Sequence, residues 1–247
     1  MHSPKRSLVP VDTLLLAYRS GIFPMSDSRE DEEVFWVEPR ERAIIPLDGL
    51  HLSQSLRKTL RADRFEVTID TAFETVIAAC AAPRPGHPES WISRRIIDSY
   101  CALHRAGHAH SVECWEGEGE ARTLAGGLYG VSFDRVFCGE SMFTVRANAS
   151  KVALAWLVAI LRRAEYRLLD CQFMTDHLAS MGAVEMPQAH YLKLLAGARG
   201  LPAMALREAW QDFTRSEPTS PSAGKAVSSA AYSSPGKRIA HSLTQTS

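Results

Sequence analysis

The sequence predicts an α+β protein in which a small N-terminal domain precedes a larger domain built on a mixed, mostly antiparallel sheet. Three strand-like segments, residues 108–115, 123–132 and 135–143, follow one another with only turn residues between them. Such spacing is typical of an antiparallel meander. A strongly apolar helix is then predicted over residues 148–164, and a further strand over 166–173. A meander, a helix and one more strand together predict the mixed sheet.

The other predicted elements each have a local signal. Residues 12–21 are predicted to form a helix with Asp12 as its cap and a glycine at its end, and residues 53–61 a second helix capped by Ser53. The remaining predictions are a turn at 22–24, an acidic exposed loop at 26–33, strands at 35–37, 43–45 and 65–70, helices at 71–82 and 93–106, a loop at 83–88, and short helices at 176–181 and 188–196.

The chain is expected to divide into three parts. Residues 1–62 are predicted to form the small N-terminal domain, and residues 63–213 the larger one. Residues 214–247 are rich in Ser, Ala, Thr and Pro and are predicted to be a disordered tail. The helix pair, meander, helix and strand of the larger domain follow the element order of the GNAT acyltransferase fold. A fold of this kind does not by itself fix a function.

Composition narrows the function classes only a little. Hydrophobic residues make up 45% of the 247 residues and charged residues 23%, and the formal net charge is zero, so attraction for phosphate must come from a local patch. The five cysteines include no CxxC pair, which argues against a disulfide framework or a zinc ribbon and favours reduced core thiols. We recognise no signal peptide or membrane span. We therefore expect a cytoplasmic monomer without metal or cofactor.

Three polar residues interrupt segments that otherwise resemble core strands. A strand interior normally excludes carboxylates, because burying an unpaired charge costs several kcal/mol. Glu140 nevertheless lies in the third strand of the meander, and Asp170 and Gln172 lie in the final strand. Asp170 and Gln172 are two residues apart, so we expect them on one face of their strand. The pattern suggests a functional site.

The most specific signal is a set of ordered sequence blocks that spans roughly residues 11 to 196. The blocks are residues 17–24 (AYRSGIFP), 55–61 (SLRKTLR), 65–73 (FEVTIDTAF), 91–92 (WI), 110–113 (HSVE), 126–130 (GGLYG), 139–143 (GESMF), 149–154 (ASKVAL) and 169–172 (LDCQ). Together they resemble the leucyl/phenylalanyl-tRNA–protein transferase family. The chain departs from the family at Met25 and at residues 35–39 (FWVEP), where tryptophans are common in the family.

The resemblance implies an aminoacyltransferase that moves Leu, Phe or Met from aminoacyl-tRNA to the N-terminal Lys or Arg of an acceptor protein or peptide. The product would be an N-degron that marks the acceptor for proteolysis. The reaction is an ester aminolysis, in which an α-amine attacks the carbonyl that joins the amino acid to the tRNA ribose. No covalent nucleophile is required, so catalysis rests mainly on holding both substrates in attack geometry.

The acid and the amide are the predicted catalytic residues. The carbonyl of Gln172 can accept a hydrogen bond from the attacking amine, and Asp170 can orient and polarise that amide. The resemblance assigns the pair this role. The carboxylate of Glu140 suits an ammonium or guanidinium group of the acceptor. Read from the residues alone, Asp170 as a loop cap, Gln172 as a satisfied core residue and Glu140 in a structural salt bridge remain open alternatives.

The predicted binding residues fall into three groups. Trp36 and Trp91 are predicted to stack on the terminal adenine of the tRNA. An apolar donor pocket is predicted from Phe137, Met142, Phe143, Leu154, Leu169 and Cys171, with Gly126 and Gly127 allowing a close backbone approach. The tRNA backbone is expected at a basic patch formed by Arg57, Lys58, Arg61 and Arg64. Each group also has a purely structural interpretation, as an interface tryptophan, as core filling or as a solvated charged face.

Two other function classes remain as alternatives. An acyl-CoA N-acyltransferase of the GNAT type would need a glycine-containing loop that binds pyrophosphate at a helix N-terminus. Residues 145–151 (VRANASK) contain no glycine, which disfavours CoA. A non-catalytic RNA-binding or degron-binding module would leave the pairing of Asp170 with Gln172 without a purpose.

Overall fold

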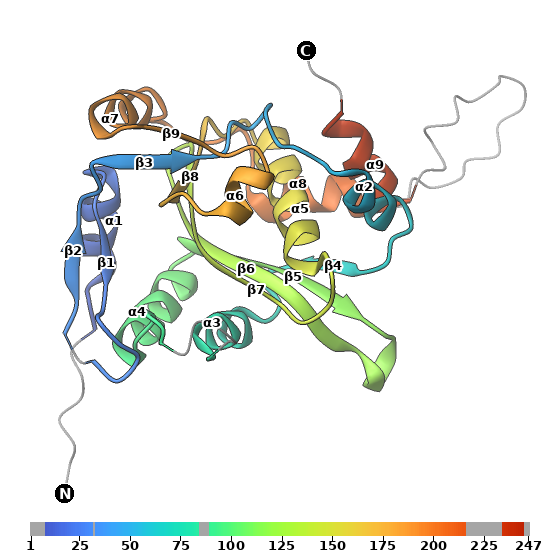
Figure 1. The fold of residues 1–247 in the computed structure, drawn as a ribbon, viewed down its shortest axis with the longest axis horizontal. Coiled ribbons are helices and arrows are strands. Elements are labelled where there is room, and N and C mark those ends of the chain that lie inside the picture. Colours follow the sequence, from blue (N-terminus) through green and yellow to red (C-terminus); the bar gives the residue numbers. More distant parts are fainter. Residues whose placement is uncertain (1–7, 32, 84–88, 216–233, 245–247) are drawn as a thin grey trace, which may run out of the picture.

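A computed structural model describes residues 8–31, 33–83, 89–215 and 234–244 (Figure 1). Its centre is a seven-stranded sheet in the spatial order β4 (Glu66–Ile69), β5 (Ala109–Glu116), β6 (Thr123–Phe133), β7 (Val136–Thr144), β8 (Leu168–Gln172), β3 (Glu41–Ile44) and β9 (Val184–Pro187). Neighbouring strands are antiparallel except β7 and β8, which are parallel. The predicted α+β class, the mixed sheet and the meander of β5, β6 and β7 are confirmed.

Helices cover both faces of this sheet (Figure 1). The helices are α1 (Val11–Arg19), α2 (Gln54–Arg61), α3 (Phe73–Ala81), α4 (Arg94–Arg105), α5 (Ala149–Arg163), α6 (Asp176–Ser180), α7 (Gln188–Gly197), α8 (Leu206–Thr214) and α9 (Pro235–Ser242), with a 3-10 turn at Gly119–Ala121. Helices α3 and α4 pack on one face, whereas α5 packs on the other and carries α2, α8 and α9. None of the helices in the described ranges is long and apolar enough to cross a membrane.

The alternation of side chains along the strands produces two hydrophobic cores. Leu128 and Phe137 belong to the core on the α5 side, whereas their chain neighbours Tyr129 and Cys138 belong to the core with α3 and α4. Successive strand residues point to opposite faces of a sheet, so one strand supplies both cores. Helix α5 is apolar on nearly all sides and is buried from Val152 through Leu161, as its composition predicts.

Local signals in the sequence place several helix ends correctly. The Ser53 hydroxyl accepts a hydrogen bond from the Leu56 N–H at 3.2 Å, so the predicted N-cap of α2 is confirmed. Ser93 caps α4 in the same way through the Ile96 N–H. Gly107, with a φ of 81°, follows the end of α4 in the left-handed conformation that glycine adopts without a steric penalty.

The N-terminal segment differs from its prediction in two places. The predicted turn at 22–24 overlaps a strand, β1 (Phe23–Met25), which pairs with β2 (Phe35–Val37) in a separate two-stranded sheet. Strand β3 lies inside the large sheet, between β8 and β9. Residues placed in the predicted N-terminal domain therefore supply one strand of the central sheet. The sequence analysis predicts neither strand β9, which is only four residues long, nor helix α8.

The prediction of a disordered tail over 214–247 is wrong for α9. This helix packs on α2, α5 and α8, and Ile239 is fully buried. Its backbone is also anchored, since the Gly236 N–H donates to Asp63 Oδ1 at 2.7 Å. The polar composition of the tail concealed one short segment with a small apolar face. The rest of the predicted tail, residues 216–233 and 245–247, lies outside the described residues.

The parallel strands β7 and β8 separate part of the way along the sheet. They pair at three positions, the last joining Cys138 to Asp170. Beyond that point β7 continues beside β6 as far as Thr144, whereas Gln172 pairs with Ala43 of β3. A gap therefore opens in the middle of the sheet, between the segments that carry Glu140 and Gln172.

Candidate active site

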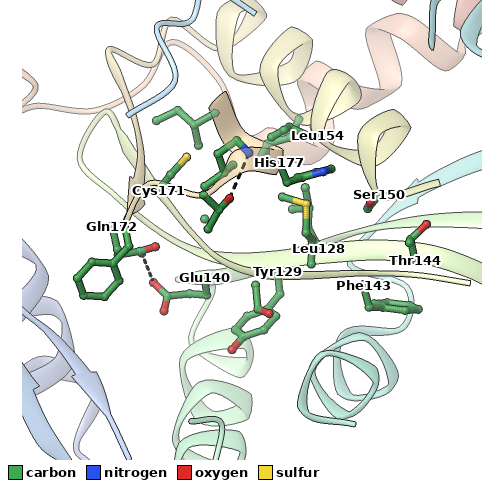
Figure 2. A pocket seen from close by; sticks show the side chains of 18 of the residues that line it. Leu128, Tyr129, Glu140, Phe143, Thr144, Ser150, Leu154, Cys171, Gln172 and His177 are labelled. Atoms are coloured by element: carbon green, nitrogen blue, oxygen red, sulfur yellow. Dashed lines mark hydrogen bonds between the residues drawn. The ribbon is translucent and has the colours of Figure 1, made fainter. Parts of the chain in front are cut away.

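A cavity of about 510 Å³ lies at this separation of β7 and β8. Figure 2 shows it from close by, with Glu140 and Gln172 at one end and Ser150 and Thr144, near the start of α5, at the other. The residues that line it are Phe23, Met25, Trp91, Leu128, Tyr129, Gly139, Glu140, Ser141, Met142, Phe143, Thr144, Ser150, Leu154, Leu157, Leu169, Cys171, Gln172, Phe173, Thr175, His177 and Leu178. Most of them are apolar, which is typical of a ligand pocket with a few orienting polar groups.

The polar end of the cavity is a hydrogen-bonded cluster around Glu140. Gln172 Nε2 donates to Glu140 Oε1 at 3.1 Å (Figure 2), and the Tyr18 hydroxyl donates to the same oxygen at 2.7 Å. The Tyr100 hydroxyl lies 3.2 Å from Oε2 and within hydrogen-bond distance of the Tyr18 hydroxyl, so the two phenol protons are shared among these three contacts. Three elements far apart in the chain, α1, α4 and β8, thus converge on one carboxyl group.

Burial raises the pKa of Glu140 to about 8, and the nearby Asp170 adds to this effect. The hydrogen bonds from Tyr18 and Tyr100 and the charge of Arg42 act in the opposite direction. Burial also raises the pKa of both tyrosines well above the ordinary value. The phenols therefore stay neutral donors, and Glu140 is the group of this cluster that changes its charge near neutral pH.

Asp170 lies behind the cavity and is fully buried. Its carboxylate forms an ion pair with Arg42 of β3, in which Arg42 Nε lies 2.8 Å from Asp170 Oδ1 and Nη2 bonds Oδ2. The Tyr191 hydroxyl and the Cys138 thiol also donate to Oδ2, at 3.1 and 3.3 Å. Burial disfavours the charged form of Arg42, but the attraction of Asp170 outweighs it and raises the pKa of Arg42.

The predicted contact between Asp170 and the Gln172 side chain is not what the structure shows. Asp170 Oδ1 accepts a hydrogen bond from the backbone N–H of Gln172 at 2.9 Å, whereas the side-chain amide of Gln172 bonds Glu140. Gln172 has a φ of 58°, a conformation that costs a non-glycine residue about 1–2 kcal/mol. Asp170 thus holds the backbone that aims Gln172, and Glu140 holds its amide.

The predicted apolar residues divide between the cavity and the core. Met142, Phe143, Leu154, Leu169 and Cys171 line the cavity as predicted. Phe137 is not among the lining residues: it is fully buried on the α5 side of the sheet.

The predicted glycines do not line the cavity either. A Cβ on Gly126 would lie 2.7 Å from the Ala149 Cβ, and one on Gly127 would lie 2.8 Å from the Val112 carbonyl oxygen. Both positions therefore serve close packing inside the fold, of α5 on β6 and of β6 on β5.

The two predicted tryptophans lie in different surroundings. Trp91 lines the cavity, as does Met25 of β1. Its carbonyl accepts a hydrogen bond from the Ser26 N–H at 3.3 Å, which fixes the N-terminal hairpin beside it. Trp36 lies on β2, is 42% exposed and does not line the cavity.

Several lining residues are not predicted by any pattern in the sequence. Phe23 and Met25 come from β1, which overlaps the predicted turn at 22–24, and Phe173, Thr175 and His177 follow β8. Burial together with the charge of Lys151 lowers the pKa of His177. The ordered blocks around residues 17–24 were the only available signal for Tyr18 and Phe23, and no pattern distinguished Tyr100 from an ordinary core residue.

The basic patch lies on α2 and just beyond it. Arg57, Lys58, Arg61 and Arg64 are all exposed. Arg64 pairs with Glu116 at 3.6 Å, and Arg57 Nε donates to the Leu52 carbonyl at 3.1 Å.

Helix α2 is tied to the α5 end of the cavity. Asn148, the N-cap of α5, donates from Nδ2 to Ser55 and Thr59 of α2, at 3.2 Å each. Ser150, two residues further on, lines the cavity. The patch is therefore carried on a helix fixed beside this end of the cavity.

No group of three or more His, Cys, Asp or Glu side chains in the described part of the chain could hold a metal ion. The cysteines there are free thiols, and burial raises the pKa of Cys138 and Cys171. Thiols with raised pKa are poor nucleophiles at neutral pH. Chemistry at the cavity therefore rests on its oxygen and nitrogen groups.

Comparison with known proteins gives two family matches. Residues 44–196 match the model of the leucyl/phenylalanyl-tRNA protein transferase, and residues 9–40 match the model of its N-terminal domain. The leucyl/phenylalanyl-tRNA–protein transferase of Novosphingobium aromaticivorans is 64% identical over 191 residues, which are 77% of this chain and 71% of that protein. Those of Zymomonas mobilis and Rhizorhabdus wittichii are each 56% identical, over 78% of this chain and 70% and 77% of their own lengths.

Proposed function

The chain belongs to the leucyl/phenylalanyl-tRNA–protein transferase family and is an aminoacyltransferase, and from this premise we propose that it moves Leu, Phe or Met from aminoacyl-tRNA to the N-terminal Lys or Arg of acceptor proteins. The product would be an N-degron, and we place the reaction in the cytoplasm with the enzyme as a monomer. The observation that carries the proposal is the cavity at the separation of β7 and β8, whose apolar lining ends at Gln172 and Glu140.

The proposed step is an ester aminolysis. The acceptor α-amine forms a C–N bond to the ester carbonyl of the donor, the C–O bond to the tRNA ribose breaks, and the ribose hydroxyl leaves with a proton. The ester is already reactive, so most of the rate enhancement would come from positioning. Holding the two reactants in attack geometry can supply on the order of 7–11 kcal/mol.

Each part of the cavity has a proposed role in that geometry. Met142, Leu154, Leu169 and the other apolar residues would hold the donor side chain. An apolar pocket distinguishes side chains by only about 1–3 kcal/mol per methylene, which agrees with acceptance of Leu, Phe and Met together. The Gln172 carbonyl would accept a hydrogen bond from the attacking amine. One acceptor position of Glu140 Oε2 remains for the cationic acceptor residue, since Oε1 already accepts two hydrogen bonds.

The tRNA would reach the cavity across α2. Trp91 is the proposed stacking partner for the terminal adenine, because it lines the cavity. Trp36 is exposed on the adjacent hairpin and would contact a part of the tRNA that lies outside the cavity. Arg57, Lys58, Arg61 and Arg64 would bind phosphates of the acceptor stem without reading its sequence.

The direct test is transfer of labelled Leu, Phe and Met from charged tRNA to peptides that begin with Arg, Lys, Asp or Glu. We expect products with Arg- and Lys-initiated peptides, none with Asp- or Glu-initiated ones, and none when the Arg peptide is N-acetylated. Ile-tRNA serves as the matched donor control, since a β-branched side chain differs from Leu in shape rather than in size. Absence of any peptide bond would contradict the proposal, and saturable binding of CoA by calorimetry would favour an acyl-CoA transferase instead.

A further inference from the structure

The contacts of Gln172 point to a role for Glu140 that the proposed function does not assign. The side-chain amide of Gln172 has a donating end, Nε2, and an accepting end, Oε1. In the structure the donating end faces Glu140 Oε1 at 3.1 Å, at the edge of the cavity (Figure 2). If the proposed function holds, the catalytic use of Gln172 depends on which end of this amide faces the incoming amine.

The charge of Glu140 decides which end that is. An ionised carboxylate offers only acceptors, so it admits only the N–H end of a neighbouring amide. The carbonyl oxygen of Gln172 is then directed away from Glu140 and is free to accept from an amine in the cavity. A protonated carboxyl carries one O–H donor, so it also admits the amide in the opposite orientation, with the NH₂ group turned to the cavity.

We propose that Glu140 is a positioning residue of this enzyme: its ionised form orients the side-chain amide of Gln172 so that the carbonyl oxygen faces the attacking amine. The inference rests on the proposed function for the identity of the amine. It does not require Asp170 to contact the amide, and the structure gives Asp170 a different task, holding the Gln172 backbone.

Glu140 itself is firmly held. Tyr18 of α1 bonds the oxygen that Gln172 also bonds, and Tyr100 of α4 bonds the other oxygen. The two phenol oxygens also lie within hydrogen-bond distance of each other, and contacts to both of its oxygens leave the carboxyl group little freedom to turn. The Gln172 amide therefore has a single orientation only when Glu140 is ionised, because the ionised carboxylate has no O–H to donate to the amide oxygen.

The charged and titratable groups that face Glu140 come from the helices and strands packed around it. Asp170 of β8 raises its pKa, Arg42 of β3 lowers it, and hydrogen bonds from Tyr18 and Tyr100 lower it. Tyr129 of β6 and Cys138 of β7 also interact with it, but burial raises their pKa well above the ordinary values, so they stay neutral. With a pKa of about 8, Glu140 populates both protonation states near neutral pH.

The test is the pH titration of the Gln172 side-chain amide in ¹⁵N-labelled protein without substrates. Its NH₂ signals are assigned by their loss in Gln172→Glu. We expect these signals to shift with a midpoint near pH 8 in the parent and to show no such titration in Glu140→Gln. Signals that do not respond to pH, or that titrate unchanged in Glu140→Gln, would overturn the proposal.

Tyr100→Phe supplies a matched variant. It removes the donor to Oε2 and leaves the Oε1 contact with Gln172 in place. Because this hydrogen bond lowers the pKa of Glu140, its loss should move the midpoint of the Gln172 titration to higher pH. An unchanged midpoint would show that the Gln172 signals report a group other than Glu140, which would also overturn the proposal.

Transfer kinetics provide a second, independent readout. Glu140→Gln should lower kcat at least tenfold, because orientation of the amide matters in the transition state, and this loss comes in addition to the rise in the KM for the Arg peptide that follows from losing the proposed cation contact. A raised peptide KM with unchanged kcat would limit Glu140 to the proposed cation contact and would overturn the positioning role. The NMR titration needs no turnover, so a failure of the proposed aminoacyl transfer would be recognised separately.

Discussion

At the scale of single residues, the ion pair between Asp170 and Arg42 limits what mutation of Asp170 can reveal. Both side chains are fully buried, and each is the main partner of the other. Arg42 additionally stacks on Phe23 and Tyr191, at 4.9 and 4.4 Å from the ring centroids. Removing one partner of a buried pair leaves an uncompensated charge, so Asp170 acts in the stability of the fold as well as at the cavity.

We predict that Asp170→Ala lowers the free energy of unfolding by about 3–5 kcal/mol, because Arg42 would remain buried without a counter-charge. Denaturant unfolding at pH 7 measures this. The double variant Arg42→Met with Asp170→Leu should recover most of the stability, since apolar replacement of a buried pair is often neutral. Transfer should stay low in both, because neither retains the hydrogen bond to the Gln172 backbone. A fully stable Asp170→Ala would contradict this account.

At the scale of elements, the site depends on the separation of strands β7 and β8 and on helix α2, which is fixed beside the cavity. Beyond the pairing of Cys138 with Asp170, β7 remains paired with β6, and β8 pairs with β3. Helix α2 is fastened to the start of α5 through Asn148. This arrangement places the exposed cationic side chains of α2 at a defined side of the cavity rather than on an unrelated surface.

Charge reversal on α2 tests that placement. The double variant Arg57→Glu with Arg61→Glu should raise the KM for aminoacyl-tRNA about tenfold and leave kcat nearly unchanged. The slope of log binding constant against log salt concentration should fall in magnitude by about one for each phosphate contact that is lost. Arg105→Glu on α4 is the control, because it reverses an exposed charge on the opposite face of the sheet. Equal KM values for the double variant and the control would make the patch an ordinary solvated surface.

At the scale of the whole molecule, the buried carboxyl of Glu140 links stability to pH. Its pKa is about 8 in the folded state, against an ordinary value of 4.5. Between these values the folded protein holds a proton that the unfolded chain has released. The unfolding free energy contributed by this group is therefore fully present below about pH 4.5 and is lost as the pH rises towards 8.

We predict that the unfolding free energy of the parent falls between pH 6.5 and 8 and that Glu140→Gln removes this part of the slope. Denaturant unfolding across that range measures both proteins. The range avoids His177, whose lowered pKa acts at more acidic pH with the opposite sign, and the thiols, which titrate above it. Parallel curves for the two proteins would contradict the raised pKa of Glu140.

Much of the fold was predictable because its signals are local. The apolar period of α5, the serine cap of α2, the glycine after α4 and the closely spaced strands of the meander all depend on neighbouring residues. Elements that depend on distant partners were missed or misread. The turn predicted at 22–24 overlaps β1, no strand is predicted at β9, and α9 lies in the predicted disordered tail. Strands β1 and β9 are only three and four residues long and α9 is mostly polar, so each owes its order to what it packs against.

The same division applies to the site. The sequence by itself determined the family, the reaction class and three polar residues that interrupt apolar strands, because those features are chemical identities and spacings along one chain. Only the tertiary structure decided which partner each polar residue has. The side-chain amide of Gln172 bonds Glu140 rather than Asp170, because Gln172 ends β8 in the left-handed conformation. Asp170 bonds Arg42, because β3 pairs with β8 although the two residues are 128 positions apart in the chain. Hydrogen bonds between distant segments follow from how the strands are packed, and spacing along the chain does not encode that packing.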